Sequence, residues 1–193
     1  MGIIECIINR CAVRRYKNKK IPKYVLDKII EAGKWGPSVH NFQPWKFLVV
    51  TNKEIIKHIS MIVLRKSKFL VLGYRTIMKI TSESILNSKA LILIYNSKSL
   101  SKRMKKFGKE YAYCAEITEV ECISAAIQNM ILVADSLKLG SNWLVLPVFC
   151  EEQISNLFKI NDPLIAILTL GFPKEKNKRA NRKNDVEIVK YYK

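Results

Sequence analysis

Gly36-Pro37-Ser38-Val39-His40-Asn41-Phe42-Gln43-Pro44-Trp45 is a loop-forming stretch with a proline near each end. Each proline fixes its own φ at about −65° and moves the preceding residue out of helical geometry. Asn41 and Gln43 are two positions apart, so in an extended segment their amides project to the same side. Each amide offers an acceptor and a donor, which suits a flat heterocycle with a polar edge. Because turns are rich in these residues, a well-ordered connector whose amides bond its own backbone explains the stretch as well.

A basic cluster, Arg10-Cys11-Ala12-Val13-Arg14-Arg15-Tyr16-Lys17, lies upstream of this loop. It follows a short apolar stretch, Ile3 to Ile8, which predicts one or two helical turns ending near Asn9. Arginine guanidinium groups are the side chains best suited to planar, bidentate recognition of phosphate. Arg10 and Arg14 align on one face only if the local backbone is helical. A solvated basic turn explains an isolated cluster of this kind without any ligand.

Two secondary-structure elements join and follow these motifs. Pro22 suits the first turn of a helix, and an apolar stripe continues that helix toward possible ends at Gly33 and Gly36. The stripe consists of Val25, Leu26, Ile29 and Ile30. After the loop, Trp45 to Thr51 is rich in β-branched and aromatic residues and predicts a strand.

The order of these features resembles the flavin-dependent nitroreductase family. Four features follow one another across residues 7 to 50: the motif R-x-x-V-R-R-Y, a helix that begins at a proline, the motif P-S-x-x-N-x-Q-P-W-x-F, and a strand. The resemblance implies an α+β fold, in which a mostly antiparallel sheet is flanked by helices, and an entwined homodimer with FMN at the subunit interface. We expect one such domain over residues 1–193, with a basic C-terminal arm at 174–193.

The middle of the chain predicts helices around one buried strand. A helix is expected over residues 52–63, and a variable lid or short helices over 64–86. Lys89 to Asn96 is a near-continuous apolar run, typical of a strand buried on both faces. The charged segment from Lys98 to Gly108 predicts a connection with weak order.

The strongest predicted helix runs from Glu119 to Leu139 and ends at Gly140. Its apolar residues recur at spacings of three and four, as in helices that pack at shallow angles. They are Val120, Ile123, Ile127, Met130, Ala134 and Leu137. Such a helix belongs either to the core of one chain or to a dimer interface, and the two roles are compatible.

The C-terminal third predicts two strands and a short helix. Asn142 to Phe149 indicates a strand, Glu151 to Phe158 a short helix, and Leu164 to Leu170 a second strand. Gly171-Phe172-Pro173 ends this strand and is similar to a G-Y-P of the family. By itself the tail from Lys174 to Lys183 suggests a solvated arm.

Net charge is the extreme feature of the composition. The chain has 193 residues and a formal charge of +18, with 49% hydrophobic and 26% charged residues. A basic protein raises the question of nucleic acid, since Lys and Arg neutralise phosphates. The charge is scattered, and no zinc spacing, glycine-rich RNA-binding signature or clear recognition helix accompanies it, which argues against that partner. A basic exterior also steers anionic small molecules.

The cysteines favour a reduced, cytoplasmic protein. There are five of them, and no two form a C-x-x-C pair, so neither a disulfide framework nor a metal site is predicted. Met1 to Ile8 is too short and lacks the leading positive charge of a secretory signal. The absence of an apolar run near 18 residues predicts no membrane span.

The resemblance also implies which residues bind the flavin. Arg10, Arg14 and Arg182 would hold the phosphate, beside Cys11 and Ala12. Four loop residues would line the ring or ribityl chain, and the backbone of the segment from Asn142 to Phe149 would pass close to the ring. The loop residues are Pro37, Ser38, Asn41 and Gln43, and the backbone positions are Leu144 and Val145.

The implied activity is that of an NAD(P)H-dependent flavin oxidoreductase. Hydride would pass from NAD(P)H through FMN to a nitroaromatic, a quinone or a similar small acceptor, with ping-pong kinetics and no catalytic side chain. Two alternatives stay open: a flavoprotein of this fold with other redox chemistry or flavin binding only, and a basic nucleic-acid-binding protein.

One residue departs from the family pattern. The first motif commonly runs R-R-S-x-R, whereas Ala12 stands here where a hydroxyl would bond the phosphate. A lost hydrogen bond to a charged group costs about 1–3 kcal/mol unless it is replaced. Weak retention of FMN is therefore expected.

Overall fold

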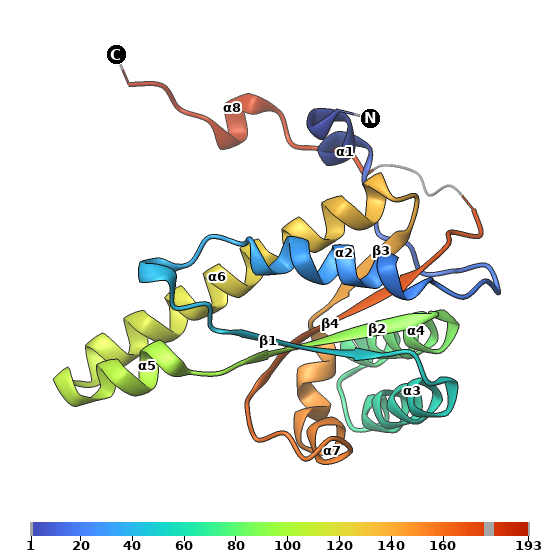
Figure 1. Ribbon diagram of the computed structural model, residues 1–193, viewed down its shortest axis with the longest axis horizontal. Helices are drawn as coiled ribbons and strands as arrows, with labels where there is room; N and C mark the ends of the chain where they lie inside the picture. The colour runs from blue at the N-terminus through green and yellow to red at the C-terminus, as the bar shows by residue number, and fades with distance from the viewer. Residues whose placement is uncertain (1, 176–179, 193) are drawn as a thin grey trace.

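The computed structural model describes residues 2–175 and 180–192, which contain a four-stranded sheet between two layers of helices (Figure 1). Every pair of neighbouring strands is antiparallel. The strand order is β1 (Trp45–Val50), β2 (Ala90–Asn96), β4 (Leu164–Gly171) and β3 (Gly140–Leu144). An antiparallel sheet flanked by helices confirms the predicted α+β fold class.

The sheet is buried on both faces, and strand β2 contributes side chains to an apolar cluster on each face. Ile92 and Ile94 pack with α2 (Lys23–Lys34) and α6 (Lys109–Ser136). Leu91 and Leu93, which point the other way, pack with the helices of the opposite layer. That layer consists of α3 (Lys53–Ser67), α4 (Leu72–Asn87) and α7 (Glu151–Asn156).

Most predicted elements lie within a few residues of the observed ones. Helix α1 spans Ile3–Asn9, and α2 begins after Pro22, which is its N-cap residue. Asn52 caps α3 by accepting hydrogen bonds from the backbone N–H groups of Glu54 and Ile55. The predicted strands at Trp45, Lys89 and Leu164 are confirmed as β1, β2 and β4.

The lid or short helices predicted over residues 64–86 are wrong. Helix α3 continues to Ser67, and α4 is a regular helix of 16 residues that packs along it. The contact between the two helices includes a polar pair: the Ser60 and Ser82 hydroxyls lie 3.0 Å apart, and each donates to the other residue's carbonyl. Serines at a buried helix interface conceal the apolar period that identifies most core helices.

The weak order predicted from Lys98 to Gly108 is also wrong. This segment forms α5 (Ser99–Met104) and a 3₁₀ turn, η2 (Lys105–Phe107). The buried carboxylate of Glu119, on α6, accepts hydrogen bonds from the Leu100 and Ser101 backbone N–H groups at 2.8 and 3.1 Å. It therefore satisfies the free donors at the start of α5.

The ends of the long helix differ from the prediction. Helix α6 begins ten residues earlier than Glu119, at Lys109, and it ends at Ser136 rather than at Gly140. Lys138 takes the left-handed conformation (φ 62°) after the helix, and Gly140 is the first residue of β3. The strand predicted from Asn142 to Phe149 is correspondingly shifted: β3 ends at Leu144, and residues 146–150 form a 3₁₀ turn, η3 (Leu146–Cys150).

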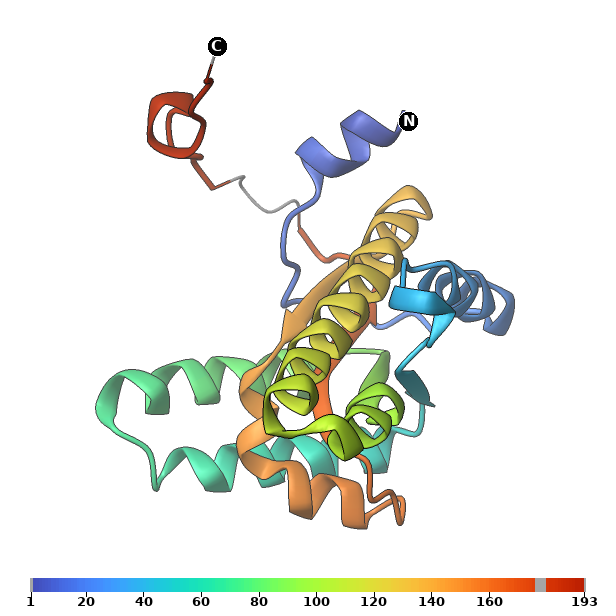
Figure 2. The same ribbon diagram turned by 90° about the vertical axis from the view of Figure 1, so that its left-hand side faces the viewer.

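Helix α6 crosses one face of the sheet (Figure 2). By length and composition it is apolar enough to cross a membrane, although no such segment was predicted. Ile123, Ile127 and Met130 are fully buried between the sheet and α2, so packing in a protein core accounts for its apolar character. The C-terminal arm and α8 (Asp185–Ile188) extend from the body on the same side as α1 (Figures 1 and 2).

Candidate functional site

The basic cluster lies in an extended segment fixed against strands β3 and β4. Helix α1 ends before it, since Arg10 has φ −59° and ψ 134°, so the helical alignment of Arg10 with Arg14 does not occur. The Val13 N–H donates to the Ser141 carbonyl at 2.8 Å, and Ala12 forms a parallel bridge with Ser141. A Cβ on Gly140 would lie 2.6 Å from Val13 Cβ, so glycine is needed at this crossing.

Tyr16 locks the far end of this segment. Its hydroxyl is buried, donates to the Val13 carbonyl and shares a 2.7 Å hydrogen bond with the Thr169 hydroxyl. Burial raises the pKa of Tyr16 well above its usual range, so the phenol stays protonated. The contacts of Val13 and Tyr16 with the protein core therefore fix the backbone segment that carries the arginines.

Five of the predicted flavin-site residues line one cavity of about 1100 Å³. They are Arg10, Cys11, Ala12, Arg14 and Arg182. Arg182 is separated from the others by 168 residues or more in sequence, and the C-terminal arm brings it to the same place. The volume lies just above the usual range for small-molecule sites, which is about 300–1000 Å³.

The donor set of this cavity suits a phosphate. Arg15 also lines it, so that among the described residues the lining has four guanidinium groups and one carboxylate, that of Glu175, which lies 3.6 Å from Arg15. Guanidinium forks match the geometry of phosphate oxygens and stay charged at all ordinary pH values. The residues present therefore fit the phosphate of FMN, which the resemblance implied for this place.

Helix α6 contributes a polar side chain and a nearby acid. Gln128 lines the cavity and is exposed. Asp135 lies in the last turn of α6. Burial raises the pKa of its carboxyl group, although the charges of Lys138 and Arg10 lower it. Neither Gln128 nor Arg15 was among the predicted binding residues; the signal for Arg15 was its place within the R-R-Y motif.

The predicted loop residues adopt a turn rather than an extended segment. Val39–Asn41 form a 3₁₀ turn, η1, and His40, Asn41 and Gln43 all have positive φ (47°, 57° and 46°). Left-handed backbone at residues other than glycine carries strain and is concentrated at functional sites. The extended geometry predicted for the two amides is wrong, but the loop is unusual in a way that favours a binding role.

The two amides meet despite the turn. Gln43 Nε2 donates to Asn41 Oδ1 at 2.8 Å, and the Gln43 N–H donates to Ser38 Oγ at 3.2 Å. The pair thus supports the loop, as a connector would. Within the described part of the chain, the side-chain NH2 group of Asn41 and the side-chain amide oxygen of Gln43 have no hydrogen-bond partner. One donor group and one acceptor are therefore left to face a ligand.

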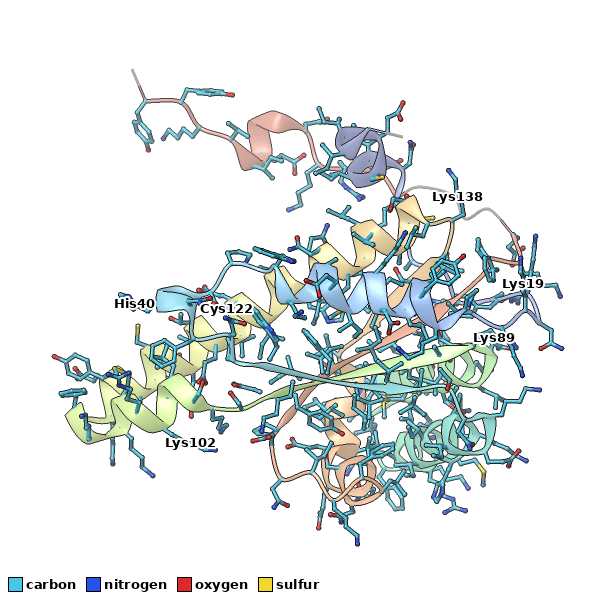
Figure 3. All side chains as sticks on the ribbon, viewed as in Figure 1. Lys19, His40, Lys89, Lys102, Cys122 and Lys138 are labelled. Carbon is cyan, nitrogen blue, oxygen red and sulfur yellow. The ribbon has the colours of Figure 1, made fainter. Side chains whose placement is uncertain are left out.

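The cavity lined by Arg10, Arg14, Arg15 and Arg182, here called the arginine cavity, and the Pro37–Gln43 loop lie beside different parts of α6. The tip of the loop shares a cavity with Ala115 and Thr118, whereas the arginine cavity reaches α6 at Gln128. Ten residues of helix correspond to about 15 Å. Figure 3 shows His40 beside the N-terminal half of α6 and Lys138 at its C-terminal end. A single chain therefore holds the two predicted halves of the site apart.

Leu144 and Val145 lie at the end of β3. Leu144 is buried in the core layer of α3 and α4, whereas Val145 is exposed. Neither lines the arginine cavity. Because Ser141 pairs with Ala12, the end of β3 is about 10 Å farther along the same strand, at a rise of about 3.3 Å per residue.

Comparison with known proteins gives a consistent set of relatives. A family model described as Nitroreductase family matches residues 7–172. A Methanothermobacter thermautotrophicus protein named as an NADH dehydrogenase/NAD(P)H nitroreductase is 30% identical over 179 residues, covering 91% of this chain and 79% of that protein.

Two solved structures share the fold. A BluB-like flavoprotein from Clostridium difficile superposes with a TM-score of 0.81 at 23% identity, covering 100% of both chains. A nitroreductase with bound FMN from Desulfitobacterium hafniense gives a TM-score of 0.78 at 18% identity, again over 100% of both chains.

Proposed function

The chain belongs to the nitroreductase family, and from this we propose that it is an FMN-dependent oxidoreductase that uses NAD(P)H to reduce a nitroaromatic, a quinone or a similar small acceptor. One observation carries the proposal. Arg182 lines the same cavity as Arg10 and Arg14, from which it is far apart in sequence. Such a set of guanidinium groups is suited to a phosphorylated cofactor.

The proposed roles follow from what each group can donate or accept. Arg10, Arg14 and Arg182 hold the phosphate, next to Cys11 and Ala12. The Asn41 NH2 group and the Gln43 carbonyl meet the polar edge of the flavin. Pro37, Ser38 and the backbone at Leu144–Val145 shape the space beside the ring. FMN, when bound, supplies a flavin ring that accepts hydride from NAD(P)H and transfers it to the acceptor.

A homodimer unites the two halves of this site. In a two-fold dimer whose axis passes the exposed side of α6 at the level of Ile123, Thr118 of one copy lies opposite Gln128 of the other, because both are five residues from that level. The loop of one subunit then meets the arginine cavity of its partner. We propose that each flavin site is built from two chains.

The surface of α6 supports this arrangement. Tyr113, Ile117 and Val120 are 67, 43 and 42% exposed and follow the spacing of one helix face. Helix α1, which contacts α6, carries Ile3, Ile4, Ile7 and Ile8, all more than half exposed. Exposed apolar side chains in such groups mark association surfaces.

The remaining expectations complete the proposal. The chain acts as one domain over residues 1–193 with a basic arm at 174–193, in the cytoplasm and without nucleic acid or membrane as a partner. Of that arm, residues 176–179 and 193 lie outside the described residues.

The test is a comparison of FMN with riboflavin, which lacks the phosphate. Binding is followed by quenching of flavin fluorescence as protein is added. If the arginine cavity holds the phosphate, FMN binds at least about tenfold more tightly than riboflavin, because charge-assisted hydrogen bonds are lost with the phosphate. Equal affinities, or no binding of either flavin, would contradict the proposal.

A further inference from the structure

A second cavity, of about 920 Å³, lies between the 39–42 loop, the α5–η2 segment and the start of α6. Its lining is aromatic and cationic: Phe42, Phe107 and Tyr111 stand beside Arg103 and Lys106. In the described part of the chain, no Asp or Glu lines it. Aromatic side chains with two nearby cations suit a flat ligand that carries a negative charge.

The charge of this region is unbalanced. Residues 98–109 contain six Lys or Arg and no acid. Lys98 lies 3.7 Å from Glu116, but among the described residues no ion pair involves Arg103 or Lys106. An uncompensated positive segment at the mouth of a cavity attracts anionic ligands.

The two cations lie against aromatic rings rather than in open solvent. The Arg103 guanidinium carbon is 5.7 Å from the centre of the Phe42 ring, and Lys106 Nζ is 4.9 Å from the centre of the Phe107 ring. A guanidinium group near a ring face keeps its N–H donors free for a carboxylate.

Arg103 also stands on a fixed support. Two residues before it, the Ser101 hydroxyl donates to Glu119 at 2.9 Å, and the backbone N–H groups of Leu100 and Ser101 donate to the same carboxylate. Glu119 is 1% exposed, so α5 is anchored to α6 through a buried acceptor. A side chain carried by an anchored helix can recognise a ligand with little loss of entropy.

Asn41 connects this cavity to the flavin site. It lines the cavity and is also one of the two amides proposed to face the flavin edge. We propose that this cavity is the acceptor site and that Arg103 determines its specificity, favouring a planar aromatic acceptor with a carboxylate or similar anionic group. The inference rests on the proposed function, because the flavin must lie beside Asn41 for the acceptor to be reduced there.

The test is the binding of two matched ligands that cannot be reduced, benzoate and its neutral analogue benzamide. Calorimetric titration of the FMN-loaded protein gives both affinities without turnover. We expect benzoate to bind at least about tenfold more tightly than benzamide, through a charge-assisted contact with Arg103. Arg103→Gln abolishes the preference, and Arg103→Lys retains part of it.

Lys102→Gln is the control, because it removes the same charge from the same helix. Lys102 does not line the cavity, and its Nζ donates to the Ser97 carbonyl. In Figure 3 it points away from the loop that carries His40. This variant keeps the benzoate preference, whereas an equal loss in both variants would mean that only the general positive field matters and would overturn the assignment.

Three further outcomes separate the possibilities. A preference that survives Arg103→Gln overturns the inference. A loss of affinity for NADPH relative to NADH in this variant, with benzoate binding unchanged, would assign Arg103 to the reductant and overturn it too. Failure of NAD(P)H to reduce the bound FMN would overturn the proposed function, and with it the acceptor role, whatever the benzoate result.

Discussion

Gly36 lies against the backbone of Ala126 so closely that a Cβ on Gly36 would be 2.8 Å from Ala126 Cα and 2.9 Å from Ala126 Cβ. The contact joins the end of α2 to the middle of α6. It fixes where the chain enters the Pro37–Gln43 loop, and therefore where the loop presents its amides relative to α6.

Gly36→Ala should lower the free energy of unfolding by about 1–3 kcal/mol, because a helix backbone cannot move aside for the added methyl group. Gly33→Ala is the control. The three atoms nearest to its Cβ would all belong to the side chain of Met130, which is flexible and can move. Urea denaturation measures both variants, and an equal cost for the two would contradict the account of the Gly36 contact.

Arg14→Ala should raise the dissociation constant of FMN. Loss of a hydrogen bond to a charged group is worth about 1.5–3 kcal/mol, or roughly 10- to 150-fold in affinity. Riboflavin affinity should change little. The exposed Arg65, in the last turn of α3, does not line the arginine cavity, so Arg65→Ala serves as the charge-matched control. Unchanged FMN affinity in Arg14→Ala would refute the phosphate assignment.

Ala12→Ser should tighten FMN binding, since it restores a hydroxyl in the lining of the phosphate cavity. The expected gain is about 1–3 kcal/mol, roughly 5- to 150-fold in the dissociation constant. Ala112→Ser, on α6 and outside that cavity, should leave the constant unchanged. An Ala12→Ser protein with unaltered FMN affinity would show that Ala12 does not face the phosphate.

Mixing two variants that each bind FMN poorly tests whether the flavin site is shared between subunits. Arg14→Ala damages the arginine half and Asn41→Ala the loop half, so a mixed dimer keeps one site with both halves intact. After subunit exchange at equal amounts, about one quarter of all sites should bind FMN normally, because half of the dimers are mixed. A mixture of Arg14→Ala with Arg10→Ala should recover none, and recovery there would argue against shared sites.

The cysteines should differ sharply in reactivity. Burial raises the pKa of the Cys150 thiol to about 11, so at pH 8 only roughly a thousandth of it is thiolate. Because the neutral thiol is favoured in the folded state, the stability that Cys150 contributes is complete below its ordinary pKa of 9.0 and declines as the pH rises toward 11. Iodoacetamide at pH 8 should modify the exposed Cys114 and spare Cys150, as peptide mass spectrometry can show. Labelling of Cys150 in the native protein would contradict its burial.

Several parts of the fold follow directly from local patterns. The run from Ala90 to Asn96 is apolar at almost every position, and only a strand covered on both faces buries such a run. The order of motifs from residue 7 to 50 was enough to identify the family. The predicted convergence of Arg182 with Arg10 could come only from that resemblance, because no local pattern relates residues so far apart.

Other parts depend on tertiary contacts that local patterns do not express. Helix α4 contacts α3 through the buried Ser60–Ser82 pair, and serines ordinarily indicate solvent-exposed faces. The buried Glu119 looks like a surface acid in the sequence, yet it organises α5. His40 and Asn41 have positive φ although neither is a glycine, the residue that usually indicates such a backbone. The turn was therefore predicted as an extended segment.

The most direct test of the central claim is an anaerobic absorbance spectrum of the purified protein loaded with FMN, before and after NADPH or NADH is added. We predict that the flavin bands bleach within the time of mixing and return when a nitroaromatic or quinone is supplied. Flavin bands that stay unchanged with both nucleotides, in protein shown to have bound FMN, would contradict the assignment of this chain as an NAD(P)H-dependent flavin oxidoreductase.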